Sequence, residues 1–465
     1  MRTFLIVISF LFLPVLTSHA QFPEDALRLS TLGFGVGGRA LGMGNAFTAV
    51  SDDYTAIFWN PAGLAQIRRN EFSAGISHLG FDNRSTFFGS QRSFSNNKTS
   101  LDNVGIVYPL PTLRGNAVVA LGYNRSNEFA TALSFDGFNP SSSIVPSLFR
   151  SDTTRDIAFL LALEGEDGST PIQSNVRQFG TVLEAGGINR WTAAGAIDVA
   201  SDLSVGLSLN FLTGSYRFTR NYTEEDSRNI YTMFPFDFDA LELDNTVDAD
   251  IVGFTAKFGL HYRKEPVKLG LAVKAPSWFD VQERFSTSGR SFFDDGFSSS
   301  ARINGTTDYN VATPFVFSAG AAVSVLGLTI SGDADFTDWT QMEFRDATPE
   351  LEGMNIQIKE IFKSTVNWRL GAEYELQPLG LRLRSGFIMN QSPYRGDPSS
   401  FNQKFVTGGL GLNVDDMVFV DAAYARGWWN TFRVNYVDPF SPTAVSRTDE
   451  DVNTDNFLLT VSFRF

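Results

Sequence analysis

The chain has 465 residues, a net charge of −14 and no cysteine. The missing cysteines exclude a disulfide-stapled domain, and the acidic balance without a basic patch excludes nucleic-acid binding. Length alone would allow about two or three soluble domains, but no linker and no break in composition divides the chain after its N-terminal region.

Residues 1–20 have the pattern of a secretory signal peptide. Arg2 gives a positive start, Phe4–Leu16 forms an apolar core, and Ser18-His19-Ala20 is a small-x-small cleavage site. A transmembrane helix is the alternative, but the apolar run is too short and no second run follows. We therefore expect an exported protein whose mature chain starts at Gln21.

Residues 21–70 do not follow a strand pattern. They hold a glycine-rich stretch, Gly33–Gly44, followed by Asn45–Asp53 and Ile57–Leu64. A phosphate-binding loop is an unsuitable interpretation, because no strand precedes the glycines, no Lys-Ser/Thr follows, and the exported compartment lacks nucleotides. Glycine permits tight, irregular folding, so we expect a compact non-strand segment here.

Beyond residue 70, fourteen stretches read as amphipathic β-strands, and the links between them alternate strictly between short and long. The short links are 109–115, 200–202, 263–266, 325–327, 377–379 and 414–415. The long links are roughly 81–100, 131–189, 219–246, 285–310, 344–362, 392–402 and 429–453. Outer-membrane barrels have this rhythm, with tight periplasmic turns and long outer loops. The predicted fold class is all-β: a transmembrane, antiparallel, up-and-down β-barrel of about 14 strands.

Each strand is apolar on one face and polar on the other, because successive side chains point to opposite faces. In 203–211 the odd positions are apolar, and the even positions are Ser204, Gly206, Ser208 and Asn210. Periodicity alone permits either a soluble barrel with an apolar core or a membrane barrel with a polar lumen. A spanning sheet must close so that no backbone group is unpaired in hydrocarbon.

The last strand, Asn456–Phe465, carries apolar side chains at alternate positions and ends on an aromatic residue. Such an ending resembles the signal that outer-membrane barrels present to the barrel assembly machinery. Together with the signal peptide, it favours the membrane barrel and places the chain in the outer membrane of a Gram-negative-type cell. We expect contact with outer-membrane lipid and lipopolysaccharide; for the acidic stretches of the long links we favour soluble loops over divalent-cation contact with anionic lipid.

Several stretches resemble one family. RALGMGNAFTAVSDDYTAIFWNPAGLA (Arg39–Ala65) is similar to the N-terminal signature of the FadL/TodX outer-membrane transporters of long-chain fatty acids and hydrocarbons. LGLAVKAPSWFD (Leu269–Asp280), DADFTDWTQMEF (Asp333–Phe344) and LRLRSGFIMNQSPY (Leu381–Tyr394) resemble later strands of that family. The resemblance implies a fourteen-stranded barrel whose lumen is closed by an N-terminal hatch.

The resemblance also implies three regions: a signal peptide at 1–20, a hatch (plug) at 21–69 and the barrel at 70–465. Asn60, Pro61 and Ala62 match the Asn-Pro-Ala element of the family's hatch. The other expected hatch residues are Gly42, Gly44, Phe47, Phe58 and Trp59. The implied function is passive uptake of a hydrophobic small molecule, a fatty acid or a hydrocarbon, with no cofactor and no metal.

The longest link contains an apolar run in an exterior position, and we expect it to form part of a capture groove for solute, as a short helix. The alternative is a loop that packs on itself. The candidate residues of this capture loop are Phe159, Leu160, Leu161 and Leu163.

In the family, solute leaves sideways through a gap at a kinked third strand. Our third strand, Asn116–Ala130, turns polar midway, and glycine inside a strand often marks a bulge. The candidate residues of the lateral opening are Gly122, Tyr123, Asn124 and Asn127. The alternative is a strand that simply emerges above the membrane.

A carboxylate solute would favour cations that face the lumen. On the predicted register these are Lys257, Arg369, Arg382, Arg384 and Arg464. We expect most of them to pair with Glu373, Glu375, Asp333 or Asp335 and to hold plug and wall together.

Three other functions compete with transport at this stage. A PorV-type barrel has a similar glycine-rich opening and serves as a partner- or cargo-binding subunit of a surface protein secretion system. An enzyme is disfavoured, because only His78 and His261 remain after signal cleavage and no Gly-x-Ser-x-Gly elbow precedes a helix. A generic open porin is disfavoured by the glycine-rich hatch.

Overall fold

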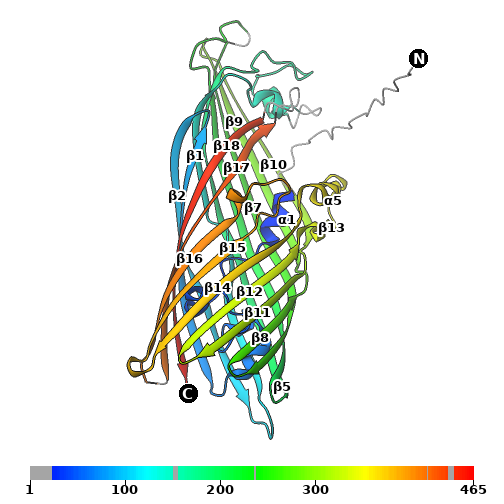
Figure 1. The fold of residues 1–465 in the computed structure, drawn as a ribbon. Coiled ribbons are helices and arrows are strands. Elements are labelled where there is room, and N and C mark those ends of the chain that lie inside the picture. The colour runs from blue at the N-terminus through cyan, green and yellow to red at the C-terminus, as the bar shows by residue number, and fades with distance from the viewer. Residues whose placement is uncertain (1–22, 150–155, 235–236, 416, 438–444) are drawn as a thin grey trace, which may run out of the picture.

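The computed structural model describes residues 23–149, 156–234, 237–415, 417–437 and 445–465 (Figure 1). The predicted signal peptide lies outside the described residues. Fourteen antiparallel strands close into one cylinder, in which the last strand pairs with the first. They are β1 (Glu71–Phe87), β2 (Ser90–Leu110), β3 (Ala117–Glu128), β5 (Val176–Ala200), β6 (Leu203–Glu225), β7 (Phe238–Lys264), β8 (Val267–Lys274), β11 (Val316–Val325), β12 (Leu328–Asp338), β14 (Ser364–Leu376), β15 (Leu381–Asn390), β16 (Gln403–Asn413), β17 (Val418–Val437) and β18 (Val445–Arg464).

Four further strands extend the wall upward. They are β4 (Thr131–Asn139), β9 (Trp278–Phe293), β10 (Ser298–Ala312) and β13 (Glu343–Arg345). The α-helices are α1 (Pro23–Ser30), α2 (Gly38–Gly42), α3 (Ala56–Trp59), α4 (Ile157–Leu160) and α5 (Pro349–Ile361), and the short 3-10 helices are η1 (Pro61–Gln66), η2 (Val145–Leu148), η3 (Trp339–Gln341), η4 (Gln377–Leu379) and η5 (Ser399–Phe401). None of the described helices is long and apolar enough to cross a bilayer.

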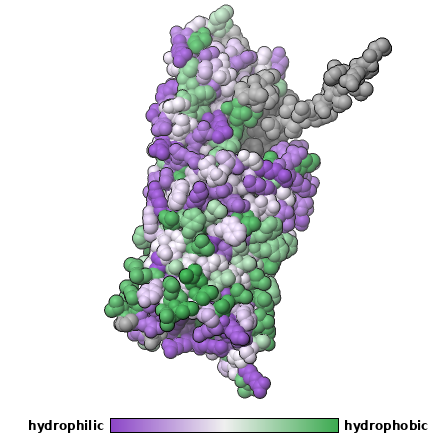
Figure 2. Space-filling view, in the orientation of Figure 1, coloured by the Kyte–Doolittle hydropathy of each residue, from purple (hydrophilic) through white to green (hydrophobic). Residues whose placement is uncertain are grey.

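The faces of the strands are inverted relative to a soluble barrel. On β6, Leu207, Leu209 and Phe211 are 47%, 46% and 50% exposed, while Ser208 and Asn210 are buried inside. Figure 2 shows apolar side chains gathered over the lower part of the barrel, below a mostly hydrophilic upper half. The outward apolar face is the one that lipid requires, so the membrane barrel is confirmed over its soluble alternative.

A row of outward aromatic side chains crosses five neighbouring strands. Tyr123, Trp191, Phe211, Phe254 and Trp278 are successive cross-strand partners. Aromatic rings gather where a barrel passes from hydrocarbon to headgroups, so this row marks the outer interface of the membrane.

The six predicted short links are confirmed as turns within a few residues. Their described residues are 111–116, 201–202, 265–266, 326–327, 377–380 and, in the last link, 414–415 and 417. Several predicted long links are wrong as loops, because most of their residues continue as strand; β1 and β2, for example, meet in a tight turn at Phe88-Gly89 instead of a loop over 81–100. Above the membrane both faces of these strands meet water or polar groups, so the apolar alternation disappears although the strands still pair.

The lipid-facing assignment predicts a strong asymmetry between positions. Leu207→Arg places a cation in hydrocarbon near the middle of the spanning part of β6 and should lower the free energy of unfolding by about 2–4 kcal/mol. Met233→Arg, in an exposed outer loop, is the matched control and should change it by less than about 0.5 kcal/mol. Urea unfolding in lipid vesicles measures both. Equal effects would contradict the assignment.

Candidate functional site

The N-terminal segment up to Gln66 folds inside the lower half of the barrel and is fastened to the wall from many sides. Backbone N–H groups of the segment donate to wall side chains at Gly37–Asp102 (3.1 Å), Gly38–Thr460 (3.0 Å), Gly44–Thr407 (3.1 Å), Thr48–Asp333 (2.7 Å) and Tyr54–Glu71 (2.8 Å). A segment without regular structure must find such partners for its buried backbone, and the polar inner face supplies them. We call residues 31–66 the plug.

Arg39 makes the strongest link between plug and wall. Its Nε and Nη2 atoms donate to both carboxylate oxygens of Glu373, each at 2.9 Å, and its guanidinium also pairs with Asp52 of the plug. Glu373 accepts a further hydrogen bond from Arg384, 2.6 Å away, and Arg384 pairs with Asp421. Bidentate, charge-assisted contacts of this kind are both strong and geometrically specific.

The acidic pair of the plug responds to this network in two directions. Burial would raise the pKa of the Asp52 carboxyl, but Arg39, Lys268 and Arg464 together lower it below its ordinary value. Burial keeps the pKa of Asp53 raised despite the same Arg39. The stability that Asp52 contributes is complete above its unfolded-state pKa of about 4 and is lost as the pH falls further. The raised pKa of Asp53 acts in the opposite sense, because its ionisation at higher pH lowers the stability of the fold.

The Asn-Pro-Ala element packs directly against the wall. The amide of Asn60 donates to the carbonyls of Thr48 (3.0 Å) and Leu260 (3.1 Å), and its oxygen accepts from the N–H of Ala62. A Cβ at the wall glycines Gly206 or Gly259 would lie within 2.4 Å of this element. Glycines in the strands therefore give the plug room.

The other predicted plug residues are also buried at this level. Gly44 adopts a φ of 59°, and a Cβ there would meet the backbone of β14 and β15, so the position needs glycine on both counts. Gly42 accepts from Thr407 and packs on Arg384. Phe47, Phe58 and Trp59 form an apolar centre of the plug with neighbouring small residues.

Three of the predicted lumen cations are paired. Arg369 contacts Asp335 (2.5 Å), Arg382 contacts Glu375 (3.5 Å), and Arg384 belongs to the network of Arg39. Arg369 and Arg382 therefore pair within the wall, and only Arg384 is joined to the plug, through Glu373 and Arg39. Arg464 pairs with Glu71 of the wall at 2.7 Å and also donates to the plug at the Asp52 carbonyl.

Lys257 belongs to a different group, which we call the cation cluster: Arg190 (β5), Lys257 (β7) and Lys274 (β8). Lys257 and Lys274 are direct cross-strand partners, and Arg190 and Lys257 lie 5.0 and 5.3 Å from the centre of the same ring, Phe58. All three are at most 6% exposed, and none forms an ion pair with a carboxylate among the described residues.

Within the described part of the chain, the hydrogen-bond partners of the cation cluster are all neutral. Arg190 donates to the Ser126 hydroxyl at 3.0 Å, and its Nε atom is buried without a partner. The Lys257 ammonium donates to the Phe58 carbonyl, and the Lys274 ammonium reaches only the Thr313 hydroxyl, at 3.4 Å. Buried cations normally have an anionic partner, because removing a charge from water is costly. This arrangement is therefore suited to receive an anion.

Directly above the cation cluster the lumen becomes apolar. We call this region the lumen cluster. Its buried wall residues are Phe129, Ile188, Leu212, Tyr216, Ala249, Ile251, Phe279, Val281, Tyr309, Val311, Trp339, Met342, Phe344, Leu351, Ile358 and Phe362. Leu212 is the cross-strand partner of Arg190, which fixes the cations at the lower boundary of the cluster. An apolar region above a cationic floor matches the two ends of an amphiphile.

Helix α1, at the start of the N-terminal segment, packs inside the lumen cluster. Ala26 and Leu29 are buried in the cluster, and Arg28 stacks on the Tyr216 ring at 3.9 Å. The helix begins at a proline and carries two acidic residues in its first turn, which suits its N-terminus. This helix of eight residues is thus held in the lumen chiefly by the apolar contacts of Ala26 and Leu29 and by the stacking of Arg28.

The wall is interrupted between β2 and β3. The two strands pair only from Leu110–Ala117 up to Asn103–Asn124, and β3 then bulges against β5 between Arg125 and Asn127. Above this point β2 has no backbone partner on that side. We call this interruption, from Arg125 to Ala130, the wall break.

The N-terminal segment and a few side chains fill the wall break. The carbonyl of Ser126 accepts from the N–H of Gly33 (3.0 Å), and the amide of Asn127 donates to the carbonyl of Thr31. The Ser100 hydroxyl of β2 reaches Glu128 at 3.0 Å. These contacts replace the missing strand pairing.

The structure places the predicted lateral residues around this break. Asn127 lies in it, whereas Gly122, Tyr123 and Asn124 lie just below, in the paired part of β3. Gly122 is needed for a different reason than a bulge: the Tyr54 hydroxyl of the plug lies where its Cβ would be. The Tyr123 carbonyl and the Asn124 side-chain oxygen accept hydrogen bonds from the Tyr54 hydroxyl, and the Tyr123 ring packs on Trp191 in the outer aromatic row.

The predicted capture loop forms the short helix α4 and the turn after it. Leu161 and Leu163 are fully buried, Phe159 is half-buried, and only Leu160 is exposed. The buried residues belong to what we call the cap cluster, a second apolar cluster at the outer end of the lumen, which also contains Phe87, Leu133, Phe135, Ile144, Val145, Ile157, Ile172, Val176, Tyr222, Phe238 and Phe293. Leu161 and Leu163 thus line no open groove in this structure, because the loop packs inward, which is closer to the alternative of a self-packed loop.

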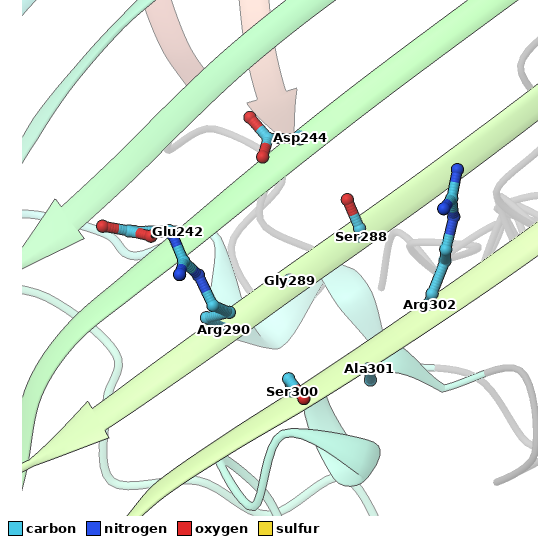
Figure 3. A pocket seen from close by; sticks show the side chains of 8 residues that line it. All are labelled: Glu242, Asp244, Ser288, Gly289, Arg290, Ser300, Ala301 and Arg302. Carbon is cyan, nitrogen blue, oxygen red and sulfur yellow. Dashed lines mark hydrogen bonds and ion pairs between the residues drawn. The ribbon is translucent and has the colours of Figure 1, made fainter.

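A hollow on the outer wall is lined by charged and small polar residues of β7, β9 and β10 (Figure 3). Glu242 and Arg290 pair there at 2.7 Å, and Arg302 lies on the next strand. The hollow faces away from the lumen and is unsuited to an apolar solute.

The unpredicted site residues carry a signal that was present in the sequence. Strict alternation assigns Arg190 and Lys274 to the inner face, beside the outward Trp191 and Val273. Phe211-Leu212 and Ile251-Val252 place apolar residues on both faces, which marks the level of the lumen cluster. The pairing of Arg39 with Glu373 has no local signal.

Comparisons with known proteins agree with this architecture. Residues 173–465 match a family model described as outer membrane protein transport protein (OMPP1/FadL/TodX). A Pseudomonas aeruginosa FadL homologue has a similar crystal structure, with a TM-score of 0.59 and 13% identity over 94% of this chain and 99% of that chain. The crystal structure of the Pseudomonas putida toluene transporter TodX has a TM-score of 0.58 and 15% identity, over 93% of this chain and 99% of that chain. The crystal structure of the Ralstonia pickettii toluene transporter TbuX has a TM-score of 0.51 and 16% identity, over 93% of this chain and 98% of that chain. No curated protein matches the sequence.

The plug network predicts the effect of removing its central arginine. Arg39→Gln leaves Asp52 and Glu373 short of a cation and should lower the free energy of unfolding by about 3–5 kcal/mol, because it breaks a buried ion pair. A loosened plug should also raise ion conductance in planar bilayers. Arg217→Gln, which breaks an exposed pair with Asp248, is the control and should cost at most about 1 kcal/mol. Identical behaviour of the two variants would refute the fastening role.

Proposed function

The chain belongs to the OMPP1/FadL/TodX family of outer membrane transport proteins, and we propose that it takes up long-chain fatty acids or similar anionic amphiphiles by passive diffusion. The family assignment supports transport of a hydrophobic compound. The observation that carries the narrower proposal is the cation cluster, which forms no ion pair with any carboxylate that the structure describes and lies beneath the apolar lumen cluster. Uptake of neutral hydrocarbon is the competing specificity, since two of the similar structures are described as toluene transporters.

A fatty acid satisfies both parts of the site at once. Its carboxylate would receive charge-assisted hydrogen bonds from Arg190 and Lys274, which otherwise meet only the Ser126 and Thr313 hydroxyls. Its acyl chain would replace Ala26 and Leu29 of α1 against the apolar wall. A neutral hydrocarbon would gain only the apolar contact with the wall and would leave the buried cations unpaired.

The wall break supports a sideways exit. It starts at the level of Tyr123, in the outer aromatic row, so it opens beside the outer leaflet. Ser126, which is bonded to Arg190, is also part of the break, so the cation cluster and the exit are adjacent. Hydrogen bonds between side chains, and with Thr31 and Gly33, close it. Such contacts can be exchanged without disrupting a paired sheet.

Removing the unpaired cations tests the substrate class. The double variant Arg190→Met with Lys274→Met should keep the fold, because it removes buried charges that lack partners. Loss of charge-assisted hydrogen bonds worth about 1.5–3 kcal/mol should weaken oleate binding about 10- to 100-fold. Radiolabelled oleate binding to the purified protein and oleate uptake by cells measure the effect.

Toluene uptake by the same variant is the internal control and should be unchanged, and Arg217→Met controls for the loss of a surface cation. Equal losses for oleate and toluene would show a structural role for the cations. Unchanged uptake of both would reject the fatty-acid proposal in favour of a neutral solute.

A cross-link over the wall break tests the exit. The chain has no cysteine, so Ser100→Cys with Glu128→Cys provides a single pair across the break for a short bifunctional thiol reagent. Cross-linking should abolish oleate uptake while oleate binding persists.

The matched control pair is Tyr108→Cys with Val119→Cys, direct partners on the outer face below the break. Cross-linking there joins strands that are already hydrogen-bonded and should leave uptake intact. Uptake that survives the upper cross-link would exclude exit at this position.

A further inference from the structure

The cylinder is complete only in its lower part. Above the short strands β11 to β16, β10 has no partner on one edge from Ser298 to Tyr309, because β13 covers only its end. On the other side, β17 has no partner on one edge from Trp429 to Val437, because β16 ends at the level of Trp428. We call the region between these two edges the side window. Figure 1 looks onto this face, where β17 and β10 rise above the shorter strands.

The side window is accessible to water from within. The inward residues of β10 from Ser299 to Thr307 are all partly exposed, although Tyr309 and Val311 of the same face are buried in the lumen cluster. The inward residues of β17 at the window, Trp429, Thr431 and Arg433, are partly exposed as well. Solvent therefore reaches part of the inner face between the two edges, although Ala301 and Ile303 also pack against the cap cluster on the upper side.

The outer end of the lumen, by contrast, is sealed. The cap cluster fills it with side chains such as Phe135, Leu161 and Phe238 that are at most 1% exposed. Buried Glu224 anchors the covering loop and accepts hydrogen bonds from the N–H of Ile144, from Gln178 and from Tyr222, each at 2.7 Å. Passage along the barrel axis would require this fastened core to come apart.

The lower rim of the side window leads to the lumen cluster. Helix α5 forms this rim and buries Leu351 and Ile358 in the cluster, while Met354 is partly exposed and Ile356 is exposed. Helix α1 lies beside α5 (Figure 1) and contacts both α5 and β10. Its Leu27 side chain is partly exposed. A continuous set of apolar side chains thus runs from the rim, past α1, to the buried cluster.

We propose that solute enters the lumen cluster sideways through the side window, over α5 and past α1, and not through the outer end of the barrel. This proposal rests on the proposed transport function and adds the route of admission. The occupant of the rim is the transported amphiphile itself, whose chain exchanges the contacts of Leu27 and Ile356 for those of the cluster. Passage needs α1 to move but leaves the cap cluster packed.

Single cysteines labelled on intact cells test the route, since the chain has no cysteine of its own. Thr307→Cys on β10 and Thr431→Cys on β17 both point into the window from its two edges. After reaction with a polyethylene-glycol maleimide, uptake of a fluorescent dodecanoate should fall about tenfold or more, because the polymer occupies the passage.

Two kinds of position serve as controls. Thr306→Cys lies next to Thr307 but on the outward face of β10, and Met233→Cys and Phe88→Cys lie on exposed outer tips. Labelling at these sites should leave uptake within about twofold of the unlabelled variant. Extent of labelling is read from the mass shift on gels, so unreacted protein is not mistaken for tolerant protein.

The outcomes separate the two proposals. If labelling at Met233 or Phe88 blocks uptake, while labelling at Thr307 and Thr431 leaves it normal, the side route is overturned and the transport function still stands. Absence of dodecanoate uptake by unlabelled protein, with the barrel present in the outer membrane, would instead overturn the proposed function and the route that rests on it.

Discussion

A backbone N–H or carbonyl in hydrocarbon must be hydrogen-bonded within the protein, and the rest of this structure depends on that requirement. It forces fourteen strands to close into a cylinder wherever lipid surrounds them. Above the outer aromatic row the requirement ends, and there the strands diverge: β2 separates from β3, and β10 and β17 keep free edges. The two irregularities of the wall are thus found where water can satisfy the backbone. Function is concentrated at the same level for the same reason.

The polar lumen is a second consequence of the inverted faces. Most inner charges are balanced by neighbouring carboxylates of the wall, as Arg384 with Glu373 and Asp421 shows, and Arg464 with Glu71. A lumen that only held a plug would balance its charges in this way throughout. The cation cluster does not, although its residues are as deeply buried as the others. Because buried unpaired charge is unfavourable, its presence is better explained by a ligand than by stability.

The sequence allowed the strand number, the tight turns and the orientation of the faces to be predicted, because each depends on a local period or on turn residues. Leu207 and Ser208 reveal their faces without any knowledge of the fold. The upper strand extensions could not be predicted, since pairs such as Arg217 with Asp248 are equally compatible with a loop. The buried state of Leu161 and Leu163 depended on partners such as Phe238, far along the chain. Lys274 has a neutral partner, Thr313, only because of how the segment around Thr313 and the plug fold. No local sequence pattern records that arrangement.

Helix α1 connects the binding region to both irregularities of the wall. Ala26 and Leu29 fill the lumen cluster, the segment that follows closes the wall break through Thr31 and Gly33, and the helix itself contacts β10 and α5 below the side window. A solute that takes the place of Ala26 and Leu29 therefore competes with the same segment that seals the exit. A ligand shifts such an equilibrium only by its differential affinity for the open and closed states. The apolar wall and the cationic floor together supply that difference to an amphiphile, whereas water or a small ion gains none of the apolar contact that the helix gives up. The barrier can thus stay closed to polar solutes and yield to the compounds that bind beneath it.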